Sequence, residues 1–179
     1  MRHRLPFYAF LLLVALAATA SAQPSKSFRA SAFVGLGGGL DSEPDSGVDN
    51  SSFQLGFSWI VEPGVLVGIR YGELGLDGSD FVGDRIDSDL SYLTVAGEYL
   101  FNDGYYHSGV YIGLGFYDLE TSLGPFAGSD SSVGLVVGVT GDFEINRRFS
   151  VLLEFSAHIT ELEQTSLFAM GHVGVGYHF

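Results

Sequence analysis

Three charged residues lie within stretches of mostly apolar sequence and are the first candidates for chemistry. Arg70, Glu98 and Glu154 each fall on the side of such a stretch where small and polar residues alternate with apolar ones. If this alternation reflects the two faces of a strand, the three side chains share one interior. There, an arginine held by two carboxylates would have its charge satisfied. The cluster could be a gate against ion flow or a structural network, and we favour the structural network.

A second set, Glu154, Ser156 and His158, has the residue types of a nucleophilic triad. Serine, histidine and acidic residues fall near one another in many chains, so the types alone carry little weight. Their spacing of two places all three on the face that carries the small and polar residues. We therefore predict no catalytic residue in this chain.

Carboxylates are concentrated between the apolar stretches, as in Asp84, Asp87 and Asp89. Oxygen ligands of this kind could bind Ca²⁺ or Mg²⁺ weakly, but the set lacks the full spacing of a calcium loop. The histidines show no His-x₃-His spacing that would indicate a zinc site. We expect a solvated, mutually repelling acidic surface, with no metal and no cofactor.

The composition limits the function classes further. The chain has 179 residues, no Cys, and 21 Asp and Glu against 8 Lys and Arg, for a formal net charge of −13. The absence of Cys excludes a disulfide scaffold, a thiolate metal site and a cysteine nucleophile. The acidic balance argues against nucleic-acid binding, which needs a basic footprint. Only 16% of the residues are charged and the mean hydropathy is positive, which is unusual for a soluble protein.

The first residues have the three parts of a secretory signal peptide. Residues 2–4 are basic, residues 5–18 are apolar, and residues 20–22 form an Ala-Ser-Ala cleavage site. The apolar run is short for a membrane span. We expect a signal peptide at 1–22 and a single exported domain at 23–179.

The exported part alternates between apolar and small or polar residues in eight segments. These are 28–40, 51–60, 65–74, 90–101, 105–117, 132–144, 149–160 and 166–179. Alternation over about ten residues is typical of a strand with one buried face. Each segment is also long enough for a tilted strand to cross a bilayer, which takes about 9–11 residues.

The connections between these segments alternate in length. Short turns at 61–64, 102–104 and 145–148 contrast with longer polar loops at 41–50, 75–89, 118–131 and 161–165. Short turns on one side and long loops on the other are typical of outer-membrane barrels. A spanning sheet must close on itself because unpaired backbone groups cost several kcal/mol in lipid. The sequence therefore predicts an all-β fold, an eight-stranded antiparallel up-and-down transmembrane β-barrel with both termini on the short-turn, periplasmic side.

The aromatic residues of the apolar face support this interpretation. Most fall at the short-turn end of their segments, and three fall near the other end, namely Phe53, Tyr71 and Phe116. Aliphatic residues lie between them, as in the interfacial girdles of membrane barrels. A soluble β-sandwich, the alternative, would bury its aromatics without regard to height.

The chain resembles small eight-stranded outer-membrane barrels related to the OmpA membrane domain and OmpX, through its signal peptide and two of its expected strands. The two strands are Leu93-Thr94-Val95-Ala96-Gly97-Glu98-Tyr99 and the ending His172-Val173-Gly174-Val175-Gly176-Tyr177-His178-Phe179. The resemblance covers 23–179 and implies a location in the bacterial outer membrane. It also implies contact with outer-membrane lipid and lipopolysaccharide. The alternating apolar residues that end in a terminal Phe resemble the assembly signal read by the barrel-assembly machinery, here Val173, Val175, Tyr177 and Phe179.

For such a barrel we expect a structural or surface-interaction role, with acidic extracellular loops and a mostly filled polar lumen. A narrow channel for small solutes is the alternative. A lipid A-modifying enzyme is less favoured, because Ser156 and His158 point inward and the known deacylase pattern is not matched. We expect a monomer that is not an enzyme and does not bind nucleic acid.

Overall fold

The structure, a computed structural model, describes residues 27–41, 49–81, 84–101, 105–123, 126–162 and 166–179. The expected signal peptide at 1–22 lies outside these residues. The strands are β1 (Phe28–Gly39), β2 (Asn50–Glu62), β3 (Val65–Phe81), β4 (Asp84–Phe101), β5 (Tyr106–Leu123), β6 (Phe126–Glu144), β7 (Phe149–Ile159) and β8 (Leu167–His178). In the described residues, no helix is long and apolar enough to cross a membrane.

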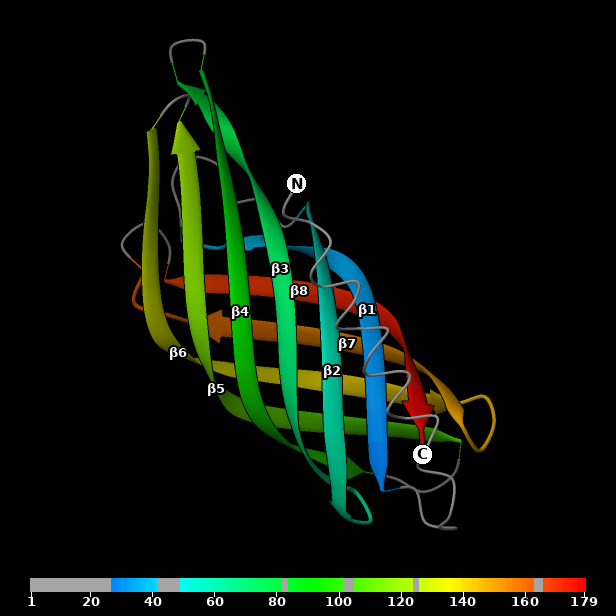
Figure 1. The fold of residues 1–179 in the computed structure, drawn as a ribbon. Helices are drawn as coiled ribbons and strands as arrows, with labels where there is room; N and C mark the ends of the chain where they lie inside the picture. Colours follow the sequence, from blue (N-terminus) through cyan, green and yellow to red (C-terminus); the bar gives the residue numbers. More distant parts are fainter. Residues whose placement is uncertain (1–26, 42–48, 82–83, 102–104, 124–125, 163–165) are drawn as a thin grey trace.

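Each strand pairs antiparallel with the next along the chain, and β8 pairs antiparallel with β1 to close a barrel. Figure 1 shows the strands wound around one axis, with β8 beside β1. Closure matters because an open sheet would leave two edges of unpaired backbone N–H and C=O groups. The predicted eight-stranded antiparallel up-and-down barrel is confirmed.

Four neighbouring strands are much longer than the other four. β3, β4, β5 and β6 have 17–19 residues, whereas β1, β2, β7 and β8 have 11–13. In Figure 1 the green and yellow-green strands rise above the rest of the barrel. We call their extensions beyond the apolar segments the tall wall, at 75–81, 84–89, 118–123 and 126–131.

The tall wall corrects the prediction of long loops at 75–89 and 118–131. These stretches are mostly paired strand, with Gly75 opposite Asp89 and Asp118 opposite Ser131. The apolar alternation ends near residues 74 and 117, but the backbone ladder continues. A strand needs an apolar outer face only where its surroundings are apolar, so the sequence pattern stops before the strand does.

The two faces of the strands are those that the alternation predicts. The outward face exposes large aliphatic side chains, such as Val133, Val34 and Ile112 at 66%, 64% and 62%. The inward face buries polar residues, including Arg70 and Glu154. This distribution is the reverse of a water-soluble protein, in which polar residues cover the outside.

Glycines on the inward face give space to large interior side chains. A Cβ atom at Gly138 would lie 2.5 Å from the Tyr111 ring, and one at Gly72 would overlap Tyr92. Both tyrosines are almost fully buried. The interior glycines at these positions therefore admit bulky neighbours.

Candidate functional site

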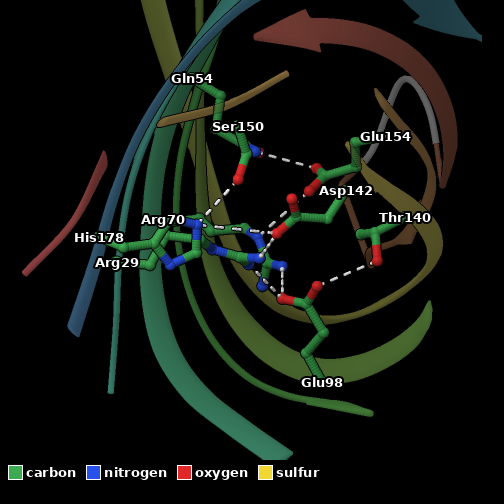
Figure 2. Close-up of polar contacts among 9 residues, drawn as sticks. All are labelled: Arg29, Gln54, Arg70, Glu98, Thr140, Asp142, Ser150, Glu154 and His178. Carbon is green, nitrogen blue, oxygen red and sulfur yellow. Dashed lines mark hydrogen bonds and ion pairs between the residues drawn. The ribbon is translucent and has the colours of Figure 1, made fainter. Parts of the chain in front are cut away.

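A network of five charged side chains spans the interior of the barrel near its short-turn end. Arg29 on β1 donates from Nη2 to Glu98 Oε2 at 2.7 Å and from Nη1 to Asp142 Oδ2 at 3.2 Å. Arg70 on β3 donates from Nη2 to Glu98 Oε2 at 3.1 Å. Its Nε lies 3.4 Å from Glu154 Oε2. Figure 2 shows the two guanidinium groups between carboxylates that come from different strands.

Glu98 is the centre of this network. Its Oε2 atom accepts from both arginines, and its Oε1 atom accepts from the Thr140 hydroxyl at 3.0 Å. The carboxylate is 3% exposed, so water does not screen these contacts. In such a setting charge-assisted hydrogen bonds offset the loss of hydration only because nearly every charge has a partner.

The structure brings together the three residues that the sequence singled out, since Arg70 contacts both Glu98 and Glu154. Sequence reasoning missed Arg29 and Asp142 as members of the network. Both lie on the inward face of their strands, which is the signal that could have found them. However, Arg29 and Asp142 are 113 positions apart in sequence, and their contact depends on the width of the barrel.

A layer of uncharged polar groups lies next to the network. Gln54 donates to Glu154 Oε1 at 2.9 Å, and the Tyr92 hydroxyl donates to Gln54 Oε1 at 3.0 Å. The guanidinium carbon of Arg70 lies 4.1 Å from the centre of the Tyr111 ring, a cation–π contact. These contacts connect the charged network to the aromatic residues farther along the axis.

An apolar cluster lies in the interior of the barrel toward the tall wall. Its members are all at most 4% exposed and come from β3, β4, β5, β8 and the stretch after β7: Leu74, Leu90, Tyr92, Tyr117, Leu119, Leu162, Phe168 and Met170. We call this cluster the apolar plug.

The Glu154, Ser156 and His158 set does not form a triad. Ser156 Oγ lies 3.0 Å from His158 Nε2, but His158 Nδ1 faces the Tyr117 hydroxyl at 2.9 Å. Glu154 instead contacts Gln54 and Arg70. The imidazole therefore lacks the acidic partner that orients the base in a triad.

No group of three or more His, Asp or Glu in the described residues is arranged to hold a metal ion. Of the three acidic residues predicted as a weak cation site, the structure describes the side chain of Asp89, whereas the side chains of Asp84 and Asp87 lie outside the described residues.

The C-terminal strand lies at the closing pair of the barrel. Val173 and Val175 point outward and are exposed. The Phe179 ring lies 5.8 Å from Tyr177 and 6.0 Å from Phe28, whose backbone N–H donates to Phe179 O at 3.1 Å. Aromatic packing therefore connects the first and last strands. The role of this segment as an assembly signal stays a prediction.

A cavity of about 830 Å³ lies at the short-turn end of the interior. Its lining includes Arg29, Asp142 and His178 from the charged network and its surroundings, and Glu62 and Glu144 near the turns. The interior thus has three parts along its axis, namely the cavity, the charged network and the apolar plug.

No family model and no curated protein sequence matches this chain. Its structure is similar to that of Neisserial surface protein A, with a TM-score of 0.71 and 13% identity over 85% of this chain and 97% of that one. A major outer membrane protein from Thermus thermophilus has a TM-score of 0.64 and 13% identity, over 86% of this chain and 98% of that one. A third similar structure is that of Ail, the attachment invasion locus protein of Yersinia pestis, in complex with the heparin analogue sucrose octasulfate. Its TM-score is 0.57 and its identity 18%, over 86% of this chain and 99% of that one. At these identities the likeness shows a shared fold.

Proposed function

We propose that this chain, which has the fold of small eight-stranded outer-membrane barrels, is an integral outer-membrane protein with a structural or surface-interaction role. It is exported by the segment 1–22, and both termini lie on the periplasmic side. The observation that carries this proposal is the apolar outer face of the closed sheet. Exposed aliphatic side chains such as Val34, Ile112 and Val133 stand outside, while arginines and carboxylates are buried inside.

The buried apolar cluster and the ion pairs of the interior support a structural or surface role over transport. The apolar plug lies toward the tall wall, and the paired charges lie between the plug and the cavity. An ion that crossed would have to separate buried pairs and then pass closely packed apolar side chains, which is expensive in a medium of low dielectric constant. We therefore expect no steady conductance.

The tall wall is the surface through which such a barrel would meet partners. Its described side chains include the carboxylates of Asp89, Asp118, Glu120 and Asp130, and no described Lys or Arg side chain opposes them there. Negative potential of this kind steers away polyanions and favours cationic surfaces. A sulfated ligand like the heparin analogue bound by Ail is therefore disfavoured for this chain.

Insertion into lipid tests the membrane part of the proposal. Folded barrels of this type should migrate differently in detergent gels before and after heating, and should fold into lipid vesicles. A chain that stays soluble and monomeric in the absence of any amphiphile would contradict the proposal, because water would then have to cover its exposed aliphatic face.

A narrow channel is the second candidate, favoured by the buried charged network and the cavity beside it. Recording in planar bilayers separates the two roles. We expect a silent bilayer for the wild-type chain. Steady openings that change in Arg70→Ala would favour the channel instead.

A lipid A-modifying activity is the less favoured third candidate. Mass spectra that show the same lipid A species with and without the protein would exclude it.

A further inference from the structure

We propose that the cavity at the short-turn end is a binding site for a small aliphatic diamine, held in its protonated, dicationic form. The inference goes beyond the proposed function, because it depends on the barrel interior and not on the membrane in which the barrel lies. It rests on the charge balance of the interior, on an unpartnered carboxylate oxygen and on the lining of the cavity.

The charged network has one more carboxylate than it has guanidinium groups. Two arginines, Arg29 and Arg70, share three acids, namely Glu98, Asp142 and Glu154. All five side chains are at most 5% exposed, so water does not compensate the difference. His178 Nε2 lies 4.0 Å from Asp142 Oδ2 and balances the excess only when the imidazole is protonated. With a neutral imidazole the excess carboxylate has no counterion, which is strongly unfavourable, so this interior attracts one more cation.

The excess charge meets the cavity at Asp142. Its Oδ2 atom accepts from Arg29, but its Oδ1 atom is buried and has no hydrogen-bond partner. Asp142 also lines the cavity. Oδ1 is itself covered, so a rotation of the Asp142 carboxylate is needed to turn it toward the cavity. An ammonium group in the cavity would then donate to this oxygen and supply the missing cation.

The second ammonium group of a diamine would find acids nearer the opening. Glu144 lies two residues beyond Asp142 on the same face of β6, which places the two Cα atoms roughly 7 Å apart along the strand. Glu62 lines the cavity from the end of β2. The lining thus has three carboxylates against one guanidinium, with His107 and His178 as the imidazoles that face the same space.

The lining also distinguishes an organic dication from simpler ions. Leu66 and Leu100 contribute apolar surface, and the volume of about 830 Å³ is in the range of small-molecule sites. Within the described residues, no three acidic or histidine side chains are arranged to hold a metal ion. The Nε atom of Arg29 also lacks a partner, but an anion bound there would add to the carboxylate excess. An aliphatic chain with an ammonium at each end fits all of these features.

Calorimetric titration of the folded chain in detergent micelles with 1,4-diaminobutane tests the proposal. We expect saturable binding, weaker binding of butylamine, and no binding of 1,4-butanediol or succinate. Asp142→Asn should weaken diamine binding by about tenfold, the loss of one charge-assisted hydrogen bond. Asp130→Asn, at the far end of the same strand, is the matched control and should bind within about twofold of wild type.

Two further measurements keep the test decisive. If Asp142→Asn fails to fold, as judged by heat-dependent migration in gels, Glu144→Gln at the mouth takes its place and should weaken binding by about threefold. Equal affinity of the wild type and the folded Asp142→Asn variant would overturn the proposal. The absence of saturable binding at millimolar diamine would overturn the proposal as well. An NMR titration of the His178 imidazole would then show whether this group, when protonated, supplies the missing cation to Asp142.

Discussion

Replacing Glu98 should destabilise the barrel more than replacing any other acidic residue of the described interior. Glu98 accepts from Arg29 at 2.7 Å, from Arg70 at 3.1 Å and from Thr140 at 3.0 Å. Removing one partner of a buried ion pair costs about 3–5 kcal/mol. Because Arg29 keeps Asp142 and Arg70 keeps Glu154, we expect Glu98→Ala to fall at the lower end, at about 3 kcal/mol.

Glu98→Gln separates charge from hydrogen bonding at the same position. The amide oxygen can still accept from the arginines, and the substitution removes the one excess negative charge of the network. We therefore expect a smaller loss, of about 1–2 kcal/mol. Glu120→Ala, on the exposed outside of the tall wall, is the control and should change stability by less than about 0.5 kcal/mol.

Equilibrium unfolding by urea from lipid vesicles measures these differences. Trp59 is the only tryptophan of the chain and is exposed on the outward face of β2, so its fluorescence reports the loss of the folded, lipid-facing state. The reasoning would be refuted if Glu98→Ala unfolded within about 1 kcal/mol of wild type. A glutamine variant less stable than the alanine variant would refute it as well.

Other changes test the faces and ends of the barrel. Val137→Arg on the outward face should cost about 2–4 kcal/mol in vesicle unfolding, and tolerance without loss would contradict the facing assignment. Gly138→Ala should cost about 1–3 kcal/mol because its Cβ would lie 2.5 Å from the Tyr111 ring; unchanged stability would show that the ring moves freely. Burial raises the pKa of Asp41, but hydrogen bonds from the chain at the start of β8 lower it overall, so this contact should be lost as the pH falls below the ordinary value of 3.8. Protection factors of the Ser166 and Leu167 amides in hydrogen exchange, corrected for the intrinsic rate at each pH, should fall only at low pH, and constant protection would contradict this. Phe179→Ala should slow folding into vesicles, since it removes the aromatic contact between the first and last strands, and an unchanged folding rate would argue against this.

The faces of the strands could be predicted from sequence because alternation is a local property. Residues such as Val137 and Gly138 take opposite sides whatever the rest of the chain does. The outer limits of β3 to β6 could not be predicted in this way. At Gly75 and Asp89 the backbone pairing persists after the apolar pattern has ended, and polar paired strand resembles loop in sequence.

The candidate site was predictable only in part. Arg70 and Glu98 lie on adjacent strands, so their proximity follows from the strand order alone. Arg29 reaches Glu98 and Asp142 across the lumen, over separations of 69 and 113 residues. No local pattern contains that information, because a cross-lumen contact depends on the diameter and the stagger of the closed sheet.

The amino-acid sequence by itself determined the number of membrane-length strands and which side chains face inward, because both follow from a repeat of two residues along the backbone. The tertiary structure alone decided which inward groups meet, where the apolar plug ends and that Asp142, which lines a cavity, keeps one buried oxygen without a hydrogen-bond partner. Those features arise only when β8 pairs with β1, since closure sets how far apart opposite walls stand.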